Sequence, residues 1–350
     1  MVKAPGNTAR RPVTLRDIAL KTDLSVSAVS MALKDHSRIG AETKSRVRKV
    51  ADQLVYVPNS AGRALRQRKS GAIALVVPNT SQHVFGHAYF THVLTGVTDA
   101  ANRGDALVSI STNPDNSHGM VAYERVMRSG SADGAIVTSA SVGDNNIFRL
   151  VASGIPVVLL GRYPHLDDAV SVGVDDEAAG YAATEHLIVA HGRRSLAHLS
   201  GPLDHQSAID RRDGFLRAVN KHSVHHSIVE GDYSEESGRV AVLGTGAGGS
   251  PFDGVFAAND EMAFGAMSAL ASRGRIVPTQ VSIVGFDDFG LSRVTTPSIT
   301  TMHVPAERMA RLATERLLDL IAGVDSHGKE PHMVLPVELV PRQSCGCVPL

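Results

Sequence analysis

Polar and aromatic side chains recur where apolar runs of strand length end, and this placement could create a binding site. The residues concerned are Asn79, Tyr89, Phe90, Arg162, Arg211, Tyr233, Asn259 and Asp287. Ligands of open parallel sheets bind outside the carboxyl ends of the strands, which is where these side chains are expected. Arginine, asparagine and aspartate beside an aromatic ring suit a hydroxyl-rich ring. The set therefore favours a sugar or a nucleoside over a lipid.

Several of these residues also have a structural alternative. Asn259 fits the start of a helix, where it would act as a cap, and Asp287 fits a turn. Arg162 could pair with Asp175 or Asp176 instead of contacting a ligand. The sequence leaves both alternatives open.

Residues 244–249 have the G-x-G-x-x-G spacing of a dinucleotide-binding loop. Such a loop needs a strand before it and a helix after it. Here the pattern predicts a helix before the glycines and a strand after them, so we interpret the segment as a flexible connection. The G-x-S-x-G motif of many hydrolases does not occur in the sequence.

Histidines and cysteines are common metal ligands, and several lie close together in this sequence. Two groups of histidines are close in sequence, namely His83, His87 and His92, and His222, His225 and His226. Each group has two histidines four residues apart, but neither pair has the nearby acid that zinc hydrolases use. Cys345 and Cys347 could oxidise or hold half a metal site, but no further cysteine completes one. We therefore expect reduced tail cysteines, no metal and no cofactor, although His83 or His87 could line the mouth of a cleft.

From residue 72 onward, apolar runs of strand length alternate with stretches of helical periodicity. This alternation occurs in two successive series, which predicts two parallel sheets with helices on both faces. Among the expected elements are one helix over 178–190 and one strand over 333–340. The last elements, from residue 298 to 340, can cross back to each lobe.

Charge is divided between the two ends of the chain. The net charge is zero, but residues 1–70 hold 15 Lys+Arg and 5 Asp+Glu, a net +10, so the remainder carries −10. A basic head on an acidic body is typical of a DNA-docking module joined to a sensor. We find no signal-peptide-like run and no apolar stretch of membrane-spanning length, and therefore expect a cytoplasmic protein without membrane contact.

The basic segment has the pattern of a helix-turn-helix. Thr14 can cap a first helix, with Asp17 three residues later bonding back to it. Residues 22–24 suit the tight turn, and Ser25 can cap the second helix. A third helix is expected over about 41–55. The outer face of the second helix, which such proteins present to base edges, carries Ser25, Val26, Ser27, Ser30 and Met31.

The stretches VTLRDIA and LSVSAVSMAL, Val57-Pro58-Asn59 and Leu65 resemble the LacI/GalR family of bacterial repressors. The resemblance covers about residues 13 to 345. It implies an all-α helix-turn-helix head and an α/β periplasmic-binding-protein-like core of two doubly wound parallel-sheet lobes. It also implies a hinge helix over 60–66, whose Leu65 wedges into the minor groove of the operator.

The resemblance also suggests roles for individual residues. Family positions matching Arg211, Tyr233, Asn259 and Asp287 commonly contact the effector. Basic side chains such as Lys34, Arg38, Lys44 and Arg46 are expected to hold phosphates. The complete set expected to contact DNA is Thr14, Ser25, Val26, Ser27, Ser30, Met31, Lys34, Asn59, Arg63 and Leu65.

Three positions depart from the family pattern. Asp23 replaces a glycine of the turn, and aspartate tolerates a left-handed conformation. Met31 replaces an arginine and cannot read guanine bidentately, which leaves the base preference open. Gly62 replaces an alanine and lowers helix propensity by about 1 kcal/mol. We therefore predict that the hinge is disordered without DNA and helical with it.

These observations predict the following domains: a flexible basic arm (1–12), a helix-turn-helix domain (13–57), a hinge helix and linker (58–70), an N-lobe (71–174 with 298–322) and a C-lobe (175–297 with 323–345). The predicted function is a repressor that binds double-stranded operator DNA as a homodimer and responds to a small-molecule effector bound between the lobes. Two alternative functions are a solute-binding protein without a DNA role, which would need an export signal, and a sugar-modifying enzyme. Neither alternative has support from a motif in its required context.

Overall fold

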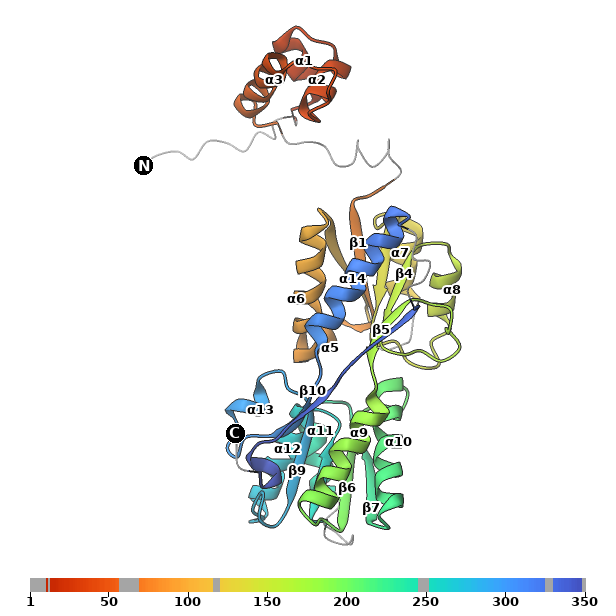
Figure 1. Cartoon of the computed structure of the whole chain (residues 1–350), viewed down its shortest axis with the longest axis vertical. Helices are drawn as coiled ribbons and strands as arrows, with labels where there is room; N and C mark the ends of the chain where they lie inside the picture. Colours follow the sequence, from red (N-terminus) through yellow and green to blue (C-terminus); the bar gives the residue numbers. More distant parts are fainter. Residues whose placement is uncertain are drawn as a thin grey trace, which may run out of the picture. The chain divides into compact units, whose positions relative to one another are not determined.

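The computed structural model describes residues 11, 13–56, 69–115, 120–244, 252–324 and 330–347 (Figure 1). Two compact units divide the chain: Met1–Ser70, the head, and Gly71–Leu350, the core. The hinge residues Asn59, Arg63 and Leu65 and most of the basic arm lie outside the described residues. No helix in the described part is both long and apolar enough to cross a bilayer.

Three short helices form the head. They are α1 (Leu15–Thr22), α2 (Val26–Leu33) and α3 (Ala41–Gln53). Each contributes a fully buried side chain to a common centre, namely Ile18, Val29 and Val47. Because three short amphipathic helices are marginal individually, this shared apolar centre is what stabilises them.

The ends of the head helices confirm the predicted capping. The Asp17 carboxylate accepts hydrogen bonds from the Thr14 amide at 2.8 Å and from its hydroxyl at 2.7 Å. The Ser25 hydroxyl accepts from the Ala28 amide at 3.1 Å and so caps α2. Asp23 has φ 53°, the left-handed conformation expected for the turn.

Two six-stranded sheets form the two lobes of the core (Figure 1). The N-lobe sheet has the order β11 (His332–Leu335), β5 (Ser171–Val174), β4 (Val157–Leu160), β3 (Gly134–Val137), β1 (Ala72–Thr80) and β2 (Leu107–Asn113), all parallel. The C-lobe sheet has the order β12 (Glu338–Val340), β10 (Thr300–His303), β9 (Ser282–Asp287), β8 (Gly254–Ala257), β6 (Ser195–Ser200) and β7 (His225–Glu230). Only β12 is antiparallel to its neighbour.

Helices cover both faces of each sheet. In the N-lobe these are α5 (Ser81–Gly86), α6 (Ala88–Arg103), α7 (Val121–Ser129), α8 (Asn146–Ala152) and α14 (Ala306–Ala322). In the C-lobe they are α9 (Asp176–Glu185), continued by a π-helical turn (His186–Ala190), α10 (Gln206–Lys221), α11 (Glu235–Gly244), α12 (Asp260–Ser272) and α13 (Leu291–Val294). A 3-10 turn (Gln343–Cys345) follows β12.

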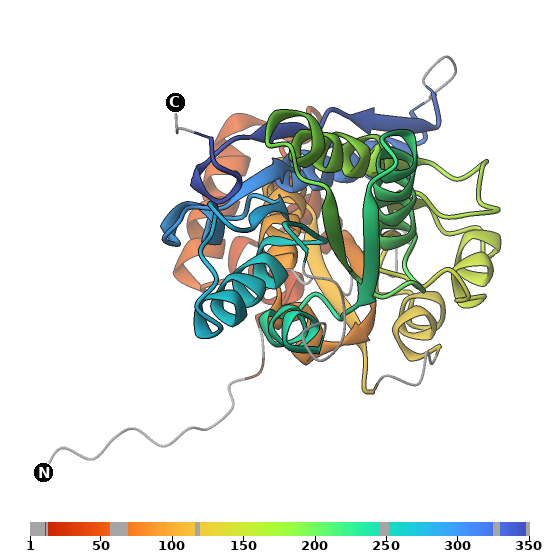
Figure 2. The same ribbon diagram turned by 90° about the horizontal axis from the view of Figure 1, so that it is seen from below.

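Successive side chains of a central strand point to opposite faces of the sheet, and each face packs against its own layer of helices. Ile73 and Leu75 of β1 pack with α6 and α14, whereas Ala74 and Val76 belong to the cluster beneath α7 and α8. Strands with both faces buried in this way read as continuous apolar runs. In Figure 2 the green helices α9 and α10 and the cyan helices α11 and α12 lie on opposite sides of the C-lobe strands.

The chain crosses between the lobes three times, as expected, but two of the crossings lie at other positions than the predicted lobe boundaries. β10 pairs with β9 in the C-lobe, although 298–322 was assigned to the N-lobe; only α14 of that segment packs there. β11 pairs with β5 in the N-lobe, although 323–345 was assigned to the C-lobe. The lobe to which each strand belongs depends on pairing with strands distant in sequence. Local periodicity in the sequence does not show this pairing.

Two expected elements are divided in the structure. The strand expected over 333–340 is two strands in different sheets, β11 and β12, because Pro336 lies between them and cannot donate a ladder hydrogen bond. The helix expected over 178–190 begins at Asp176 and ends in the π-helical turn. The short helices α5 and α13 were not expected.

Candidate functional site

The face of the head that the sequence predicted to contact DNA is accessible. Ser25, Val26 and Ser27 are exposed at the start of α2, while Ser30 and Met31, one turn later, are half-buried. Val26 retains 44% of its surface. Thr14 and Lys34 are exposed as well. The accessible end of α2 is thus its amino-terminal end, the end that helix-turn-helix proteins present to base edges.

Two of the basic side chains near this face are already paired. Asp35 accepts ion pairs from Lys44 at 3.0 Å and from Arg48 at 3.1 Å. Lys34, Arg38 and Arg46 have no ion pair within the described residues. These three remain the better candidates for phosphate contacts, since Lys44 would first have to leave Asp35.

A cavity with about 1030 Å³ of space, part of it open to solvent, lies between the lobes of the core. Both lobes contribute to its wall. Seven of the eight residues predicted to bind a ligand line it: Tyr89, Phe90 and Arg162 from the N-lobe, and Arg211, Tyr233, Asn259 and Asp287 from the C-lobe. Asn79 is not among the lining residues; its side chain accepts a hydrogen bond from the Thr80 amide at 2.8 Å.

Arg211 is the most constrained charged group of the cavity. Its Nε donates to Asp176 at 2.7 Å and its Nη1 to the carbonyl oxygen of Ala258 at 2.7 Å. The guanidinium carbon lies 3.7 Å from the centre of the Phe286 ring. Burial opposes the charge, but the carboxylates of Asp176 and Asp287 outweigh it and raise the pKa of Arg211. The guanidinium is therefore charged and fixed in orientation, with Nη2 directed at Asp287.

The close packing of α9 on α10 holds Arg211 in this position. A side-chain carbon at Gly214 would overlap the carbonyl oxygen of Glu177, and one at Gly180 would overlap the backbone of Arg211 itself. Glycine at both positions lets the two helices approach until Asp176, at the start of α9, reaches the guanidinium.

Asp287 lies at the end of β9 with φ 101°, a backbone conformation rare for residues with a side chain. Its Oδ1 is 3.8 Å from Arg211 Nη2, too far for a hydrogen bond. Burial raises the pKa of Asp287 to about 7, and Arg211 only partly offsets this effect. Strain and a costly buried charge at one residue are typical of a functional position rather than of a stabilising one.

Asn259 and Tyr233 form one structural unit. The Asn259 side chain accepts from the Met262 amide at 2.9 Å, which caps α12, and donates to the Tyr233 carbonyl at 2.8 Å. The capping alternative raised by the sequence is therefore present. Tyr233, at φ 69°, has a buried hydroxyl without a hydrogen bond of standard geometry in the described structure, although Ser207 is near enough to influence its pKa. A buried hydroxyl without a partner has a free energy cost that a ligand can remove.

The N-lobe wall includes several aromatic side chains. The Tyr89 hydroxyl lies 3.1 Å from that of Thr138, while Phe90 is only 2% exposed and packs against the rings of Tyr89 and His83. Burial, with the charge of His87, lowers the pKa of His83 to about 4. This wall presents flat apolar surface with hydroxyl groups at its edge.

Arg162 joins the two lobes across the cavity. It pairs with Asp210 of α10 at 2.9 Å, not with Asp175 or Asp176 as the sequence alternative suggested. A second bridge is formed by the Val142 amide and the Asp204 carbonyl oxygen at 2.6 Å. Residues at the mouth of the cavity therefore form contacts between the lobes, and these contacts depend on how closely the lobes approach.

Several lining residues were not predicted: Thr138, Tyr163, Asp176, Gln206, Ser207, Asp210 and Glu261. Asp176 could have been found, because it is the second residue after the end of β5. Gln206 and Ser207 could not, because α10 begins at Gln206, whereas the periodicity predicts a helix only from residue 209.

Comparisons with known proteins agree with this architecture. Residues 14–59 match "Bacterial regulatory proteins, lacI family", and residues 184–345 match "Periplasmic binding protein-like domain". The probable HTH-type transcriptional repressor ExuR of Bacillus subtilis (strain 168) is 32% identical over 316 residues, covering 89% of this chain and 92% of that protein. The chain belongs to the lacI family of bacterial regulatory proteins.

Further relatives support the same conclusion. The HTH-type transcriptional regulator CelR of Thermobifida fusca is 30% identical over 346 residues, covering 96% of this chain and 99% of that protein. A crystal structure of the lac repressor dimer bound to operator and the anti-inducer ONPF has a TM-score of 0.85 and 26% identity, covering 96% of this chain and 99% of that one. The protein is thus a DNA-binding transcriptional repressor of the LacI family and not an enzyme, and the fold class expected from the sequence is confirmed.

Proposed function

We propose that this repressor binds a neutral sugar or a nucleoside between its lobes, and that the bound ligand sets its affinity for operator DNA. One observation carries the proposal: Arg211 Nη2 and Asp287 Oδ1 face each other across a 3.8 Å gap. A single hydroxyl oxygen can accept a hydrogen bond from the first and donate one to the second. Arg211 Nε and Nη1 are already used within the protein, so the direction of the remaining donor is fixed.

The charges of the cavity favour a neutral ligand. Its wall has four carboxylates, Asp176, Asp210, Glu261 and Asp287, against the two arginines Arg162 and Arg211. Both arginines already pair with wall carboxylates. A sugar phosphate or sugar acid would therefore meet unneutralised negative charge, whereas a hydroxyl-rich ring can use the carboxylates as acceptors. The aromatic rings of Tyr89 and Phe90 in the cavity wall suit packing against the face of the ligand's ring.

Ligand control requires that the ligand favour one arrangement of the lobes. The cavity meets this requirement, because a ligand held by Arg211 and Asp287 in the C-lobe also touches the N-lobe wall. The Arg162–Asp210 pair at the mouth would change with the lobe angle. Three crossing segments connect the lobes, so a change of angle reaches the start of β1, to which the hinge is joined.

On the DNA side, we propose that α2 reads bases through Ser25, Val26, Ser27, Ser30 and Met31, with Thr14 and Lys34 at phosphates. Asn59, Arg63 and Leu65 belong to the hinge, and their roles come from family resemblance. A homodimer would present two such heads to a near-palindromic operator. The lac repressor dimer bound to operator supports this assembly by analogy, and an operator-binding repressor acts in the cytoplasm.

The test combines ligand binding with DNA binding. Thermal unfolding of the whole protein is measured with neutral mono- and disaccharides, nucleosides, uronic acids and sugar phosphates, followed by gel shifts of the DNA upstream of its own gene. We expect a neutral compound to raise the melting temperature and to change the fraction of DNA bound. Stabilisation by charged sugars only would contradict the ligand class, and ligand binding without any effect on the gel shift would contradict the regulatory role.

A further inference from the structure

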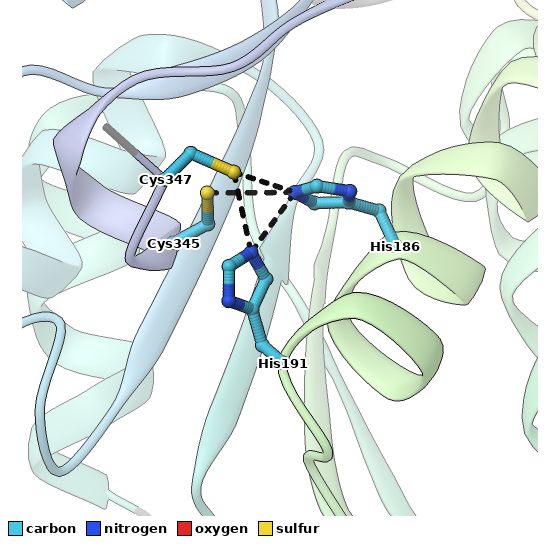
Figure 3. A group of neighbouring side chains, drawn as sticks. All are labelled: His186, His191, Cys345 and Cys347. Atoms are coloured by element: carbon cyan, nitrogen blue, oxygen red, sulfur yellow. Dashed lines mark hydrogen bonds between the residues drawn. The ribbon is translucent and has the colours of Figure 1, made fainter. Parts of the chain in front are cut away.

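Four potential metal ligands meet in the C-lobe, far from the cavity between the lobes. His186 begins the π-helical turn after α9 and His191 directly follows that turn, while Cys345 and Cys347 come from the end of the described chain. Figure 3 shows both imidazole rings and both sulfur atoms directed at one point. The sequence predicted reduced tail cysteines without showing their burial; Cys345 is fully buried, Cys347 is half-buried, and both are free thiols.

The distances between the donor atoms match those of a tetrahedral site. His186 Nε2 lies 3.1 Å from His191 Nε2 and 3.4 Å from Cys345 Sγ. Cys347 Sγ lies 3.5 Å from His191 Nε2 and 3.7 Å from His186 Nε2, and all four atoms lie within 4.8 Å of one another. Zinc bonds of usual length give tetrahedral edges of about 3.3 Å between two nitrogens and about 3.6 Å between nitrogen and sulfur. Four of the six donor–donor distances are therefore close to those of a tetrahedral zinc site, and all donors lie within 4.8 Å of one another.

The fold makes this convergence through two local irregularities. His186 and His191 are five residues apart, which in an α-helix would separate their directions by about 140°. The π-helical turn, with bonds between residues five apart, brings both rings to the same side. Wide turns of this kind occur frequently at functional sites.

The second irregularity lies between the cysteines. Gly346 has φ 107°, and a side chain there would press against the His191 ring. This turn lets Cys345 and Cys347 face the same point although only one residue separates them. Glycine is the residue that adopts this conformation without strain.

Surrounding hydrogen bonds fix the buried thiol. The Thr300 hydroxyl donates to Cys345 Sγ at 3.0 Å, and the Ser282 hydroxyl donates to the Cys345 carbonyl at 2.7 Å. Donors to ligand atoms of this kind orient and stabilise thiolates in metal sites. Both hydroxyls come from central strands of the C-lobe sheet, β9 and β10, so the cysteine is held by rigid elements.

We propose that His186, His191, Cys345 and Cys347 bind one Zn²⁺ ion in a closed tetrahedral site. Two imidazoles and two thiolates suit zinc, and four protein ligands leave no position open for a substrate, so the site is structural. Each thiol releases its proton to solvent when it binds the ion. The metal fastens the segment after β12 to the end of α9 and thereby stabilises the C-lobe, independently of any ligand in the cavity.

The first experiment uses the whole wild-type protein, without a purification tag and kept reduced. Metal content is measured after growth with zinc and dialysis against a weak chelator, and the metal-free protein is titrated with Co²⁺. We expect about one zinc per chain, and visible bands of tetrahedral cobalt with a thiolate charge-transfer band. Absence of binding in both measurements would overturn the proposal, as would a Cys345–Cys347 disulfide in reduced preparations.

Variants then identify the ligands. Cys347→Ser and His191→Ala change half-buried ligands, and His225→Ala changes an exposed histidine of β7 as a matched control. We expect the first two to lose the charge-transfer band or weaken metal binding at least a hundredfold, and the control to keep wild-type affinity. Equal binding in all three would contradict the assignment. Circular dichroism shows whether a variant has lost only a metal-binding side chain or has also lost its fold. The cobalt spectrum of the wild type tests the site even if a variant does not fold.

Discussion

Replacing Arg211 by glutamine tests the centre of the cavity. Arg211 and Asp176 have side chains only 10% and 13% exposed, and each is the nearest ion partner of the other. Removing one partner of a buried pair typically costs about 3–5 kcal/mol, because the other charge remains buried. At about 2–4 °C per kcal/mol for domains of 150–250 residues, we expect the core melting temperature to fall by at least 6 °C.

Arg212→Gln provides the matched control. Arg212 is the next residue of α10, is more exposed and, among the described residues, has its ion pair with its neighbour Asp213. Such an exposed pair contributes less than about 1 kcal/mol, so the control should melt within about 4 °C of the wild type. Both variants are compared by differential scanning calorimetry and, with the ligand found by screening, by isothermal titration calorimetry.

Arg211→Gln should also weaken ligand binding. Loss of one hydrogen bond from a charged donor is worth about 2 kcal/mol, which is about thirtyfold in the dissociation constant. Arg212→Gln should bind as the wild type does. If Arg211→Gln matched the control in both stability and ligand affinity, the reasoning about the Arg211 network would be refuted.

Three further predictions address other parts of the molecule. Since the pKa of Asp287 is raised to about 7, the folded protein retains between about pH 4 and 7 a proton that the unfolded chain has lost, and the stability that this proton contributes is lost as pH rises through 7. Denaturant unfolding should therefore show Asp287→Asn gaining stability relative to wild type between pH 5 and 8. Parallel curves of unfolding free energy against pH for the two proteins would contradict the pKa shift. Gly214→Ala should separate α10 from α9, lowering stability by about 1–3 kcal/mol and weakening ligand binding, whereas unchanged calorimetry would show that the helices can adjust to the added carbon. Leu65→Ala should reduce operator affinity at least about tenfold in fluorescence anisotropy without changing binding to unrelated DNA, and an equal loss on both DNAs would argue against a minor-groove wedge.

Local signals predicted the head well because its structure depends on neighbouring residues. The Thr14–Asp17 pair, the Ser25 cap and the left-handed Asp23 each require only residues within one turn. The strand ends of the core were also readable, since buried parallel strands are continuous apolar runs. This is why Arg211 and Asp287 could be expected in one cavity before their distance was known.

Features that depend on partners distant in sequence were not predictable in this way. Nothing near Pro336 shows that the strands on either side join different sheets. The sequence suggested Asp175 or Asp176 as the partner of Arg162, and its actual partner Asp210 follows only from the approach of the lobes. The meeting of His186 with Cys345 requires both a π-helical turn and a chain end returning beneath β9 and β10.

The most direct test of ligand control measures operator affinity by fluorescence anisotropy at zero and saturating concentrations of the ligand that stabilises the core. Wild type and Arg211→Gln are compared, with Arg212→Gln as control. We predict equal operator affinity for all three without ligand, and a ligand-induced change of at least about tenfold in wild type and control that is absent or needs far more ligand in Arg211→Gln. Wild-type operator affinity that stays the same when the cavity is saturated would contradict the account.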